Sequence, residues 1–326
     1  MAESTEGPSR EKRFASANVL TPGDGRSSHT FQSLWFGSTI SPYEGMCFRS
    51  FVDHGHSFHL YSYTPNLDAP DGVCLKDAEA ILSKDEYFTY KKGRGAGSHS
   101  AFSNLFRYKL LLERGGWWVD TDVVCLSDNI PEYDEFFALE SDDFVNGAIL
   151  FFRPNDPLMR ECMHVAQSVR DQAAWGEIGP RLITRMLKES ARFRDAKGSE
   201  ACYPVHHREA LDVLRPEMAL SLERRIQGSD FLHLWNEMFR RAGVAKTMLP
   251  PKGSLLRSVA DRYHVDGWTG EYNADAIEQL LSLEAEFVQV REELNRIRKQ
   301  ENRNLSSFPE RLRLGSILLG RRGKAR

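Results

Sequence analysis

Residues Ala101 to Leu126 read AFSNLFRYKLLLERGGWWVDTDVVCL, and this stretch decides the fold. Its first half places apolar side chains at a roughly helical period and then reaches a glycine pair, which tolerates the positive φ angles at which helices end. Its second half is dense in aromatic and β-branched residues, which is typical of a buried strand. The pattern predicts a helix that stops at Gly115-Gly116 and a strand that carries Asp120-Thr121-Asp122 within it or at its end.

Two carboxylates interrupt this otherwise apolar strand. Side chains alternate along an extended chain, so Asp120 and Asp122 are expected on one side, about 6 to 7 Å apart at Cα. Carboxylates without partners are costly to bury, and a hard divalent cation with an oxygen-rich partner, such as a nucleotide diphosphate, removes that cost. A bare Asp-x-Asp more often marks a strand-end turn in which Asp122 caps the next segment, so the surrounding residues must decide.

The surrounding residues carry a resemblance. Phe106-Arg107-Tyr108, Gly115-Gly116-Trp117 and Asp120-Thr121-Asp122 follow one another as in the DXD-type sugar transferases of glycosyltransferase family 32. That group includes α-1,4-galactosyltransferases and initiating α-1,6-mannosyltransferases, and it is similar to the glucosyltransferase domains of large bacterial toxins. The resemblance spans roughly Phe31 to Asn236. It implies an α/β fold of the GT-A type, a Rossmann-like mixed sheet flanked by helices, which binds a nucleotide-sugar donor and a divalent metal, usually manganese, with magnesium as the alternative.

The resemblance also implies metal ligands. Asp122 would hold the metal directly, and Asp120 would contact the ribose or a metal-bound water. His233-Leu234-Trp235 resembles the H-x-W element of the family, in which the histidine is a further metal ligand and the indole N–H of Trp235 donates to the β-phosphate. The alternative for His233 is a core residue with satisfied hydrogen bonds, as is usual for a lone histidine in an apolar run.

Three further residues are expected at the donor. Trp35, in Trp35-Phe36-Gly37, resembles the family tryptophan that stacks on the nucleotide base, although a first-strand aromatic is more often simply core. Arg107 would hold the donor sugar together with an aspartate three residues earlier, and its alternative is a structural salt bridge to Glu113 or Asp120. Here the earlier residue is Asn104, which accepts a hydrogen bond but lacks the charge. Asp120, Asp122 and Arg107 form the candidate catalytic set.

The remaining polar candidates are weaker. Lys91 to Gly97 is a basic, glycine-rich loop that either closes over a diphosphate or is a solvated connector. Gly179-Pro180 would open a helix beside the pocket. Glu140, Asp142 and Asp143 are the acids nearest to the predicted reaction centre, although such acidic loops are usually just solvated.

Histidines outside the H-x-W element are given no metal role. His54, His56 and His59 lack a cysteine or carboxylate at the usual zinc spacing. His206 and His207 are interpreted as core residues with satisfied hydrogen bonds.

A strand–helix–strand opening predicts a parallel sheet. The expected elements are a strand at 31–37, a helix at 42–54, a strand at 56–63, an amphipathic segment at 76–83, strands at 136–140 and 144–152, and a helix at 157–170. The expected organisation is a disordered segment (1–28), a glycosyltransferase domain (29–272), a long amphipathic helix (273–304) and a basic tail (305–326).

Composition limits the function class. The 326 residues can form one large domain with appendages, and 43 basic against 46 acidic residues argue against a dedicated nucleic-acid binder. Five dispersed cysteines suit buried, reduced thiols, and neither a signal peptide nor a membrane-length apolar run is recognised. We therefore expect a cytoplasmic enzyme. The basic tail either rests on anionic lipid at the inner face of a membrane or is disordered, and the 273–304 helix either forms a coiled coil between copies or packs locally.

The sequence predicts a metal-dependent, retaining glycosyltransferase. It would move a hexose from a nucleotide sugar, with UDP expected, to a hydroxyl of a glycan or glycolipid in surface polysaccharide synthesis. A non-catalytic nucleotide-sugar binder and a transferase that acts on a protein side chain stay open as alternatives. A glycoside hydrolase is disfavoured because Asp120 and Asp122 lie on one strand face rather than opposed across a bond.

Overall fold

The structure is a computed structural model that describes residues 28–306. The expected disordered segment 1–28 and the basic tail 305–326 lie almost wholly outside the described residues. The centre of the molecule is a six-stranded sheet in the order β3-β2-β1-β4-β7-β6. Its strands are β1 (Thr30–Trp35), β2 (Ser57–Ser62), β3 (Val73–Asp77), β4 (Gly116–Val119), β6 (Phe136–Ser141) and β7 (Phe144–Phe152).

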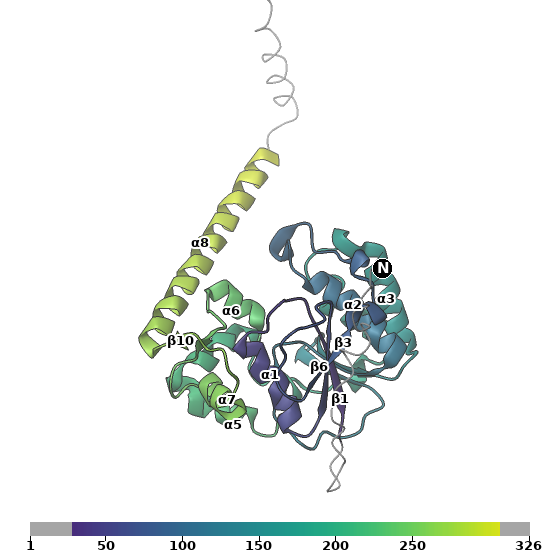
Figure 1. Cartoon of the computed structure of the whole chain (residues 1–326). Helices are drawn as coiled ribbons and strands as arrows, with labels where there is room; N and C mark the ends of the chain where they lie inside the picture. Colours follow the sequence, from purple (N-terminus) through teal and green to yellow (C-terminus); the bar gives the residue numbers. More distant parts are fainter. Residues whose placement is uncertain (1–27, 307–326) are drawn as a thin grey trace, which may run out of the picture.

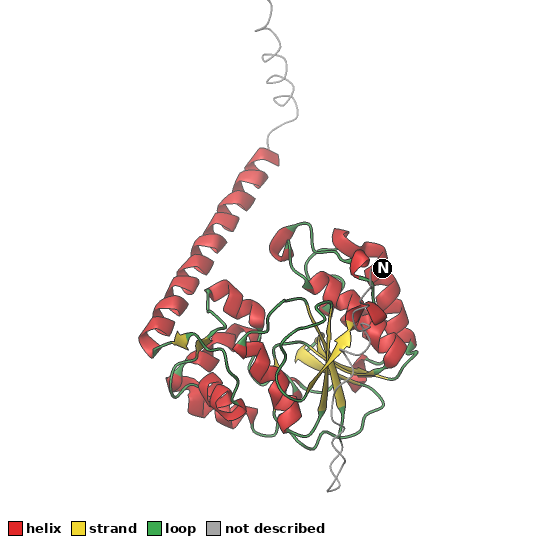
Figure 2. Ribbon diagram, viewed as in Figure 1, coloured by secondary structure: helices red, strands yellow, loops and turns green. Residues whose placement is uncertain are grey.

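The sheet is mixed. Strands β3, β2, β1 and β4 run parallel, whereas β7 pairs antiparallel with both β4 and β6. Helices cover the sheet on both faces (Figure 2). They are α1 (Pro42–Asp53), α2 (Ser100–Arg114), α3 (Pro157–Val169), α4 (Pro180–Glu189), α5 (Ala219–Ile226), α6 (Asn236–Ala242), α7 (Leu255–Tyr263) and α8 (Ala274–Ser306). The predicted α/β class, with a mixed sheet flanked by helices and a C-terminal helix, is confirmed.

Neighbouring aromatic residues divide the core into two layers. Trp117 belongs to the core layer that includes residues of α1 and α7, whereas Trp118 belongs to the layer that includes residues of α2, α3 and α4. The adjacent Phe136 and Phe137 divide in the same way. This follows from the two-residue period of a strand, and each large apolar side chain that is fully buried stabilises the fold by about 1.5 to 3 kcal/mol.

The glycine pair ends α2 as predicted. Gly115 caps the helix at φ 65°, and Gly116 continues at φ 89°. A Cβ atom on Gly115 would stand 2.6 Å from the Pro154 ring. Only glycine combines this backbone conformation with this close contact.

Two expectations about local structure are wrong. The segment 76–83 is not one amphipathic element but the end of β3 followed by a short 3₁₀ helix, Ala78–Ala80. The strand after the glycines also ends earlier than expected, at Val119. Asp120 to Asp122 form a turn, because a central strand would bury both carboxylates between two apolar layers. The chain then forms β5 (Val123–Cys125), which leaves the main sheet.

The C-terminal helix α8 extends away from the body of the molecule (Figure 1). Its first turns are anchored by the buried Ile277 and by an ion pair of 2.7 Å between Arg215 Nε and Glu278 Oε1. Between residues 28 and 306, no helix combines the length and the apolar character needed to cross a membrane. All five cysteines are buried and unpaired, as expected.

Candidate functional site

A two-stranded sheet brings together residues that are far apart in the sequence. Strand β5 pairs antiparallel with β8 (Phe231–His233), with Val123 opposite His233. The backbone N–H of Leu234 also donates to the Asp122 carbonyl at 2.9 Å. The imidazole of His233 therefore lies beside the Asp122 carboxylate.

Asp122 is held at both carboxylate oxygens. His233 Nε2 lies 3.3 Å from Oδ1, and the backbone N–H of Asn236 donates to Oδ2 at 2.7 Å. Burial acts to raise the pKa of Asp122, but the charge and hydrogen bond of His233, together with the Asn236 N–H, lower it overall. Burial likewise acts to lower the pKa of His233, and Asp122 raises it overall. The site favours an ionised Asp122.

Asp120 has different partners. Its Oδ1 accepts hydrogen bonds from Arg107 Nη2 at 2.6 Å and from Trp118 Nε1 at 2.8 Å. The Arg107 guanidinium also lies over the Trp118 ring, 4.9 Å from its centroid. Burial raises the pKa of Asp120, although Arg107 acts to lower it. The salt-bridge alternative for Arg107 is thus formed, with Asp120 rather than Glu113, and it orients the carboxylate.

Three of these side chains suit a divalent cation. One ligand atom from each of Asp120, Asp122 and His233 lies within 4.8 Å of the other two. Among the described residues, the buried Nδ1 of His233 has no hydrogen-bond partner, so His233 is not a core histidine with both nitrogens satisfied. Two carboxylates and an imidazole are ligands that Mn²⁺ and related cations accept. The residues present therefore fit the predicted metal.

Trp235 lies against this cluster. Its ring centroid is 4.2 Å from that of His233, and its backbone has a left-handed conformation at φ 55°. The indole N–H donates to the Val205 carbonyl at 2.8 Å. The N–H that was expected to meet a phosphate is therefore engaged within the protein in this structure.

The other two predicted donor residues lie on β1 and α2. Trp35 is partly buried at the carboxyl end of β1, where its indole donates to the Thr39 carbonyl at 3.2 Å. Since Gln32 of β1 pairs in parallel with Trp118, Trp35 and Asp120 lie at the same edge of the sheet. Asn104 is buried against α4, and a Cβ atom on Gly179 would stand 2.9 Å from its Nδ2.

Two residues of the basic, glycine-rich loop contact the segment 171–175. Lys91 forms an ion pair with Asp171, and Gly95 lies so close to the Trp175 ring that a Cβ atom would overlap it. Gly179-Pro180 opens α4 as predicted.

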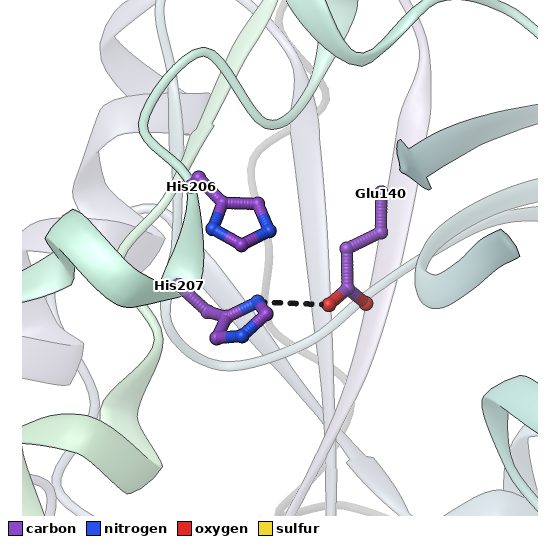
Figure 3. Close-up of side chains that lie close together, drawn as sticks. All are labelled: Glu140, His206 and His207. Atoms are coloured by element: carbon purple, nitrogen blue, oxygen red, sulfur yellow. Dashed lines mark ion pairs between the residues drawn. The ribbon is translucent and has the colours of Figure 1, made fainter. Parts of the chain in front are cut away.

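The structure contains a second polar cluster that the sequence did not predict. His206 and His207 are partly exposed and gather with Glu140 (Figure 3), so the core interpretation of these two histidines is wrong. Asp142 and Asp143, in contrast, are exposed in the turn between β6 and β7. The only signal in the sequence was the adjacent histidine pair, since nothing local links it to Glu140.

Two family models match adjoining parts of the chain. "Glycosyltransferase sugar-binding region containing DXD motif" matches residues 41–137, which include α2 and the Asp120–Asp122 turn. "Alpha 1,4-glycosyltransferase conserved region" matches residues 151–264, which include α4, His233 and Trp235.

Two curated proteins and one solved structure are similar to parts of this chain. The human alpha-1,4-N-acetylglucosaminyltransferase is 30% identical over 53% of this chain and 55% of its own length. The mouse lactosylceramide 4-alpha-galactosyltransferase is 26% identical over 49% of this chain and 46% of its own length. The chain thus spans about half the length of these relatives. The solved glycosyltransferase GlyE of Streptococcus pneumoniae is 10% identical, with a TM-score of 0.39, over 78% of this chain and 63% of its own.

Proposed function

We propose that this chain is a DXD-containing glycosyltransferase that transfers a hexose from a nucleotide sugar to a hydroxyl of a glycan or glycolipid. The observation that carries the proposal is the convergence of Asp120, Asp122 and His233 at one edge of the sheet. UDP is the expected nucleotide, and Mn²⁺ or Mg²⁺ the expected metal. We further propose that the transfer retains the anomeric configuration of the sugar. The reaction would belong to surface polysaccharide synthesis.

Each side chain has a separate role. Asp122 and His233 would hold the cation, since both are fixed by the β5–β8 pairing. Asp120, oriented by Arg107 and Trp118, would contact the ribose or a metal-bound water. When bound, the cation offsets negative charge that develops on the departing diphosphate. Arg107 and Asn104 would lie near the sugar, and Trp35 near the base.

The acceptor proton needs a base. We assign none from the protein, because the departing phosphate oxygen itself can take the proton as the acceptor hydroxyl attacks. Glu140 does not fill this role readily, since its carboxylate is engaged by Asn146 and His207.

Calorimetry tests this proposal. UDP is titrated into the wild type with and without Mn²⁺, and the titration is repeated on Asp122→Ala and on Asp142→Ala as a matched control. Asp142 is exposed in the β6–β7 turn, so its loss should change nothing. Metal-dependent binding that disappears only in Asp122→Ala supports the proposal. Equal binding in all three proteins, or none in any, would overturn it.

Turnover distinguishes the enzyme from a non-catalytic binder. That alternative is favoured by Asn104, which stands where the family has an aspartate. Release of UDP from UDP-hexoses by the wild type, absent in Asp122→Ala, supports catalysis. Tight UDP binding without release from any UDP-hexose, with or without candidate acceptors, would favour the binder.

We also propose that α8 pairs with α8 of a second copy. Its apolar residues beyond the anchored turns follow the alternating spacing of four and three that coiled coils use, and all are exposed. They are Leu283, Phe287, Val290, Leu294 and Ile297, with Phe287 73% exposed. Light scattering should give a dimer for the wild type and a monomer for Phe287→Glu/Leu294→Glu, and a monomeric wild type contradicts the pairing. A cytoplasmic location with membrane contact through the basic tail stays a prediction.

A further inference from the structure

Glu140, His206 and His207 form a cluster that the donor site does not use. One ligand atom from each side chain lies within 4.8 Å of the other two. The carboxylate comes from β6, and the two imidazoles come from the start of the 3₁₀ helix His207–Leu214 and the residue before it. Figure 3 shows both rings on the same side of the carboxylate. Two segments 66 positions apart (206 − 140) thus present three metal-ligating groups to one point.

Hydrogen bonds through Asn146 position the Glu140 carboxylate. Glu140 Oε2 accepts a hydrogen bond from Asn146 Nδ2 at 2.8 Å, and Asn146 Oδ1 in turn accepts from the Ala148 N–H at 2.8 Å. These bonds leave Oε1 turned toward the histidines. Metal-binding carboxylates are commonly oriented by outer hydrogen bonds of this kind.

The nearer histidine pairs with the carboxylate in a geometry that is not aligned for a hydrogen bond. His207 Nδ1 lies 3.0 Å from Glu140 Oε1, yet this buried nitrogen makes no aligned hydrogen bond within the described residues. Burial, and then the charge of His206, lower the pKa of His207, although Glu140 opposes them. Neutral imidazole is the form that binds metals. The two groups form an ion pair, and both also face the point at which a cation would sit.

The second histidine has a weak local contact. The backbone N–H of Arg208 lies 3.3 Å from His206 Nδ1, which leaves Nε2 as the ligand atom. Metal binding at Nε2 would move the ring proton to Nδ1 and release this long contact. The ring stands 3.9 Å from that of His207 between centroids, so the two imidazoles are already side by side.

We propose that Glu140, His206 and His207 form a second divalent-cation site, with Zn²⁺ the best-matched ion. Two imidazoles and one carboxylate are a ligand set that zinc sites with an open position use. Zinc bonds of about 2.1 Å hold tetrahedral ligand atoms roughly 3.4 Å apart, so small side-chain rotations close the set. The ion would tie the His207–Leu214 segment to the edge of β6.

The site is separate from the donor cation. The indole of Trp235 lies near one ring of each cluster, with its centroid 4.2 Å from the His233 ring and 5.6 Å from the His207 ring. The two clusters share no ligand. The second site can therefore be measured without nucleotide, and its failure would leave the proposed transferase function untouched.

The experiment measures Zn²⁺ affinity by competition with a chromophoric chelator. It uses full-length Asp122→Asn without nucleotide, so that the donor site contributes little. One Zn²⁺ per chain is expected. Adding His206→Gln/His207→Gln should weaken binding by more than the roughly 10- to 100-fold that loss of an outer partner costs, and Asn146→Ala should fall within that range.

His164→Gln is the matched control, since His164 is exposed on α3 and belongs to neither cluster. Thermal unfolding of each variant without metal checks the fold, and the single His206→Gln and His207→Gln variants repeat the test with smaller changes. Absence of stoichiometric zinc in Asp122→Asn would overturn the proposal. Equal zinc affinity with and without the two histidines would overturn it as well.

Discussion

The two polar clusters have the same kinds of side chain but are built differently. Asp122 and His233 are fixed by strand pairing, with backbone hydrogen bonds at both Asp122 and Leu234. Glu140 lies on β6 and His207 at the start of the 3₁₀ helix His207–Leu214, and the two side chains meet in an ion pair. The first cluster is supported by backbone pairing and is recognisable from sequence motifs, whereas the second depends on contacts between segments that no motif marks. Matched substitutions in the two clusters can separate their roles.

The largest expected effect is on ligand affinity, where the same substitution in each cluster should weaken a different ligand. His233→Gln should weaken Mn²⁺-dependent UDP binding by at least about 100-fold, because it removes a direct ligand of the donor cation and loss of an outer partner alone costs roughly 10- to 100-fold. His207→Gln makes the same chemical change in the second cluster and should alter UDP affinity by less than about threefold. Zinc affinity should respond in the opposite pattern. Calorimetry with each ion measures both, and parallel losses in the two variants would show that the clusters act as one site.

Zinc should also stabilise the folded chain. Zn²⁺ at about 100 times its dissociation constant should add about 2.7 kcal/mol to the free energy of unfolding, because it binds the folded site. The gain should be visible in urea unfolding of Asp122→Asn and absent once His206 and His207 are both replaced by glutamine. A gain that survives both replacements would place the ion elsewhere.

The Arg107–Asp120 pair should contribute more than an exposed ion pair. Arg107→Ala should lower the free energy of unfolding by about 2 kcal/mol, since it leaves the partly buried Asp120 without its cation. Arg153→Ala is the control, because Arg153 pairs with Asp134 in solvent and such pairs contribute about 1 kcal/mol or less. Urea unfolding of both variants measures the difference. Equal losses would show that burial of the first pair is unimportant.

The smallest expected effect is on the choice of donor sugar. Asn104→Asp restores the carboxylate of the family pattern, and it should change UDP affinity by less than about threefold while altering which UDP-hexose is turned over fastest. A panel of UDP-sugars measured on both proteins tests this. An unchanged order of sugars would remove Asn104 from sugar choice.

The sequence predicted what depends on local chemistry. The end of α2 followed from Gly115-Gly116, and the two-layer core follows from the strand period at Trp117-Trp118. The proximity of Asp122 and His233 was predicted only through the family resemblance, because the β5–β8 pairing joins segments about 110 residues apart. Glu140 and His207 had no such motif. The sequence left open whether Asp120 to Asp122 lie in the strand or in a turn at its end, because strand propensity does not include the cost of burying two carboxylates; the structure forms the turn.

The alternation at Trp117 and Trp118 makes this stretch intolerant of changes in length. Deleting one codon between Gly116 and Asp120 would exchange the side chains presented to the two layers, because the strand period is two. Deleting two codons would return each side chain to its original layer of the core. It would also draw Asp120 back into the sheet, away from Arg107. A point substitution in this strand leaves the facing of its neighbours unchanged, whereas insertions and deletions should be confined to loops such as the β6–β7 turn.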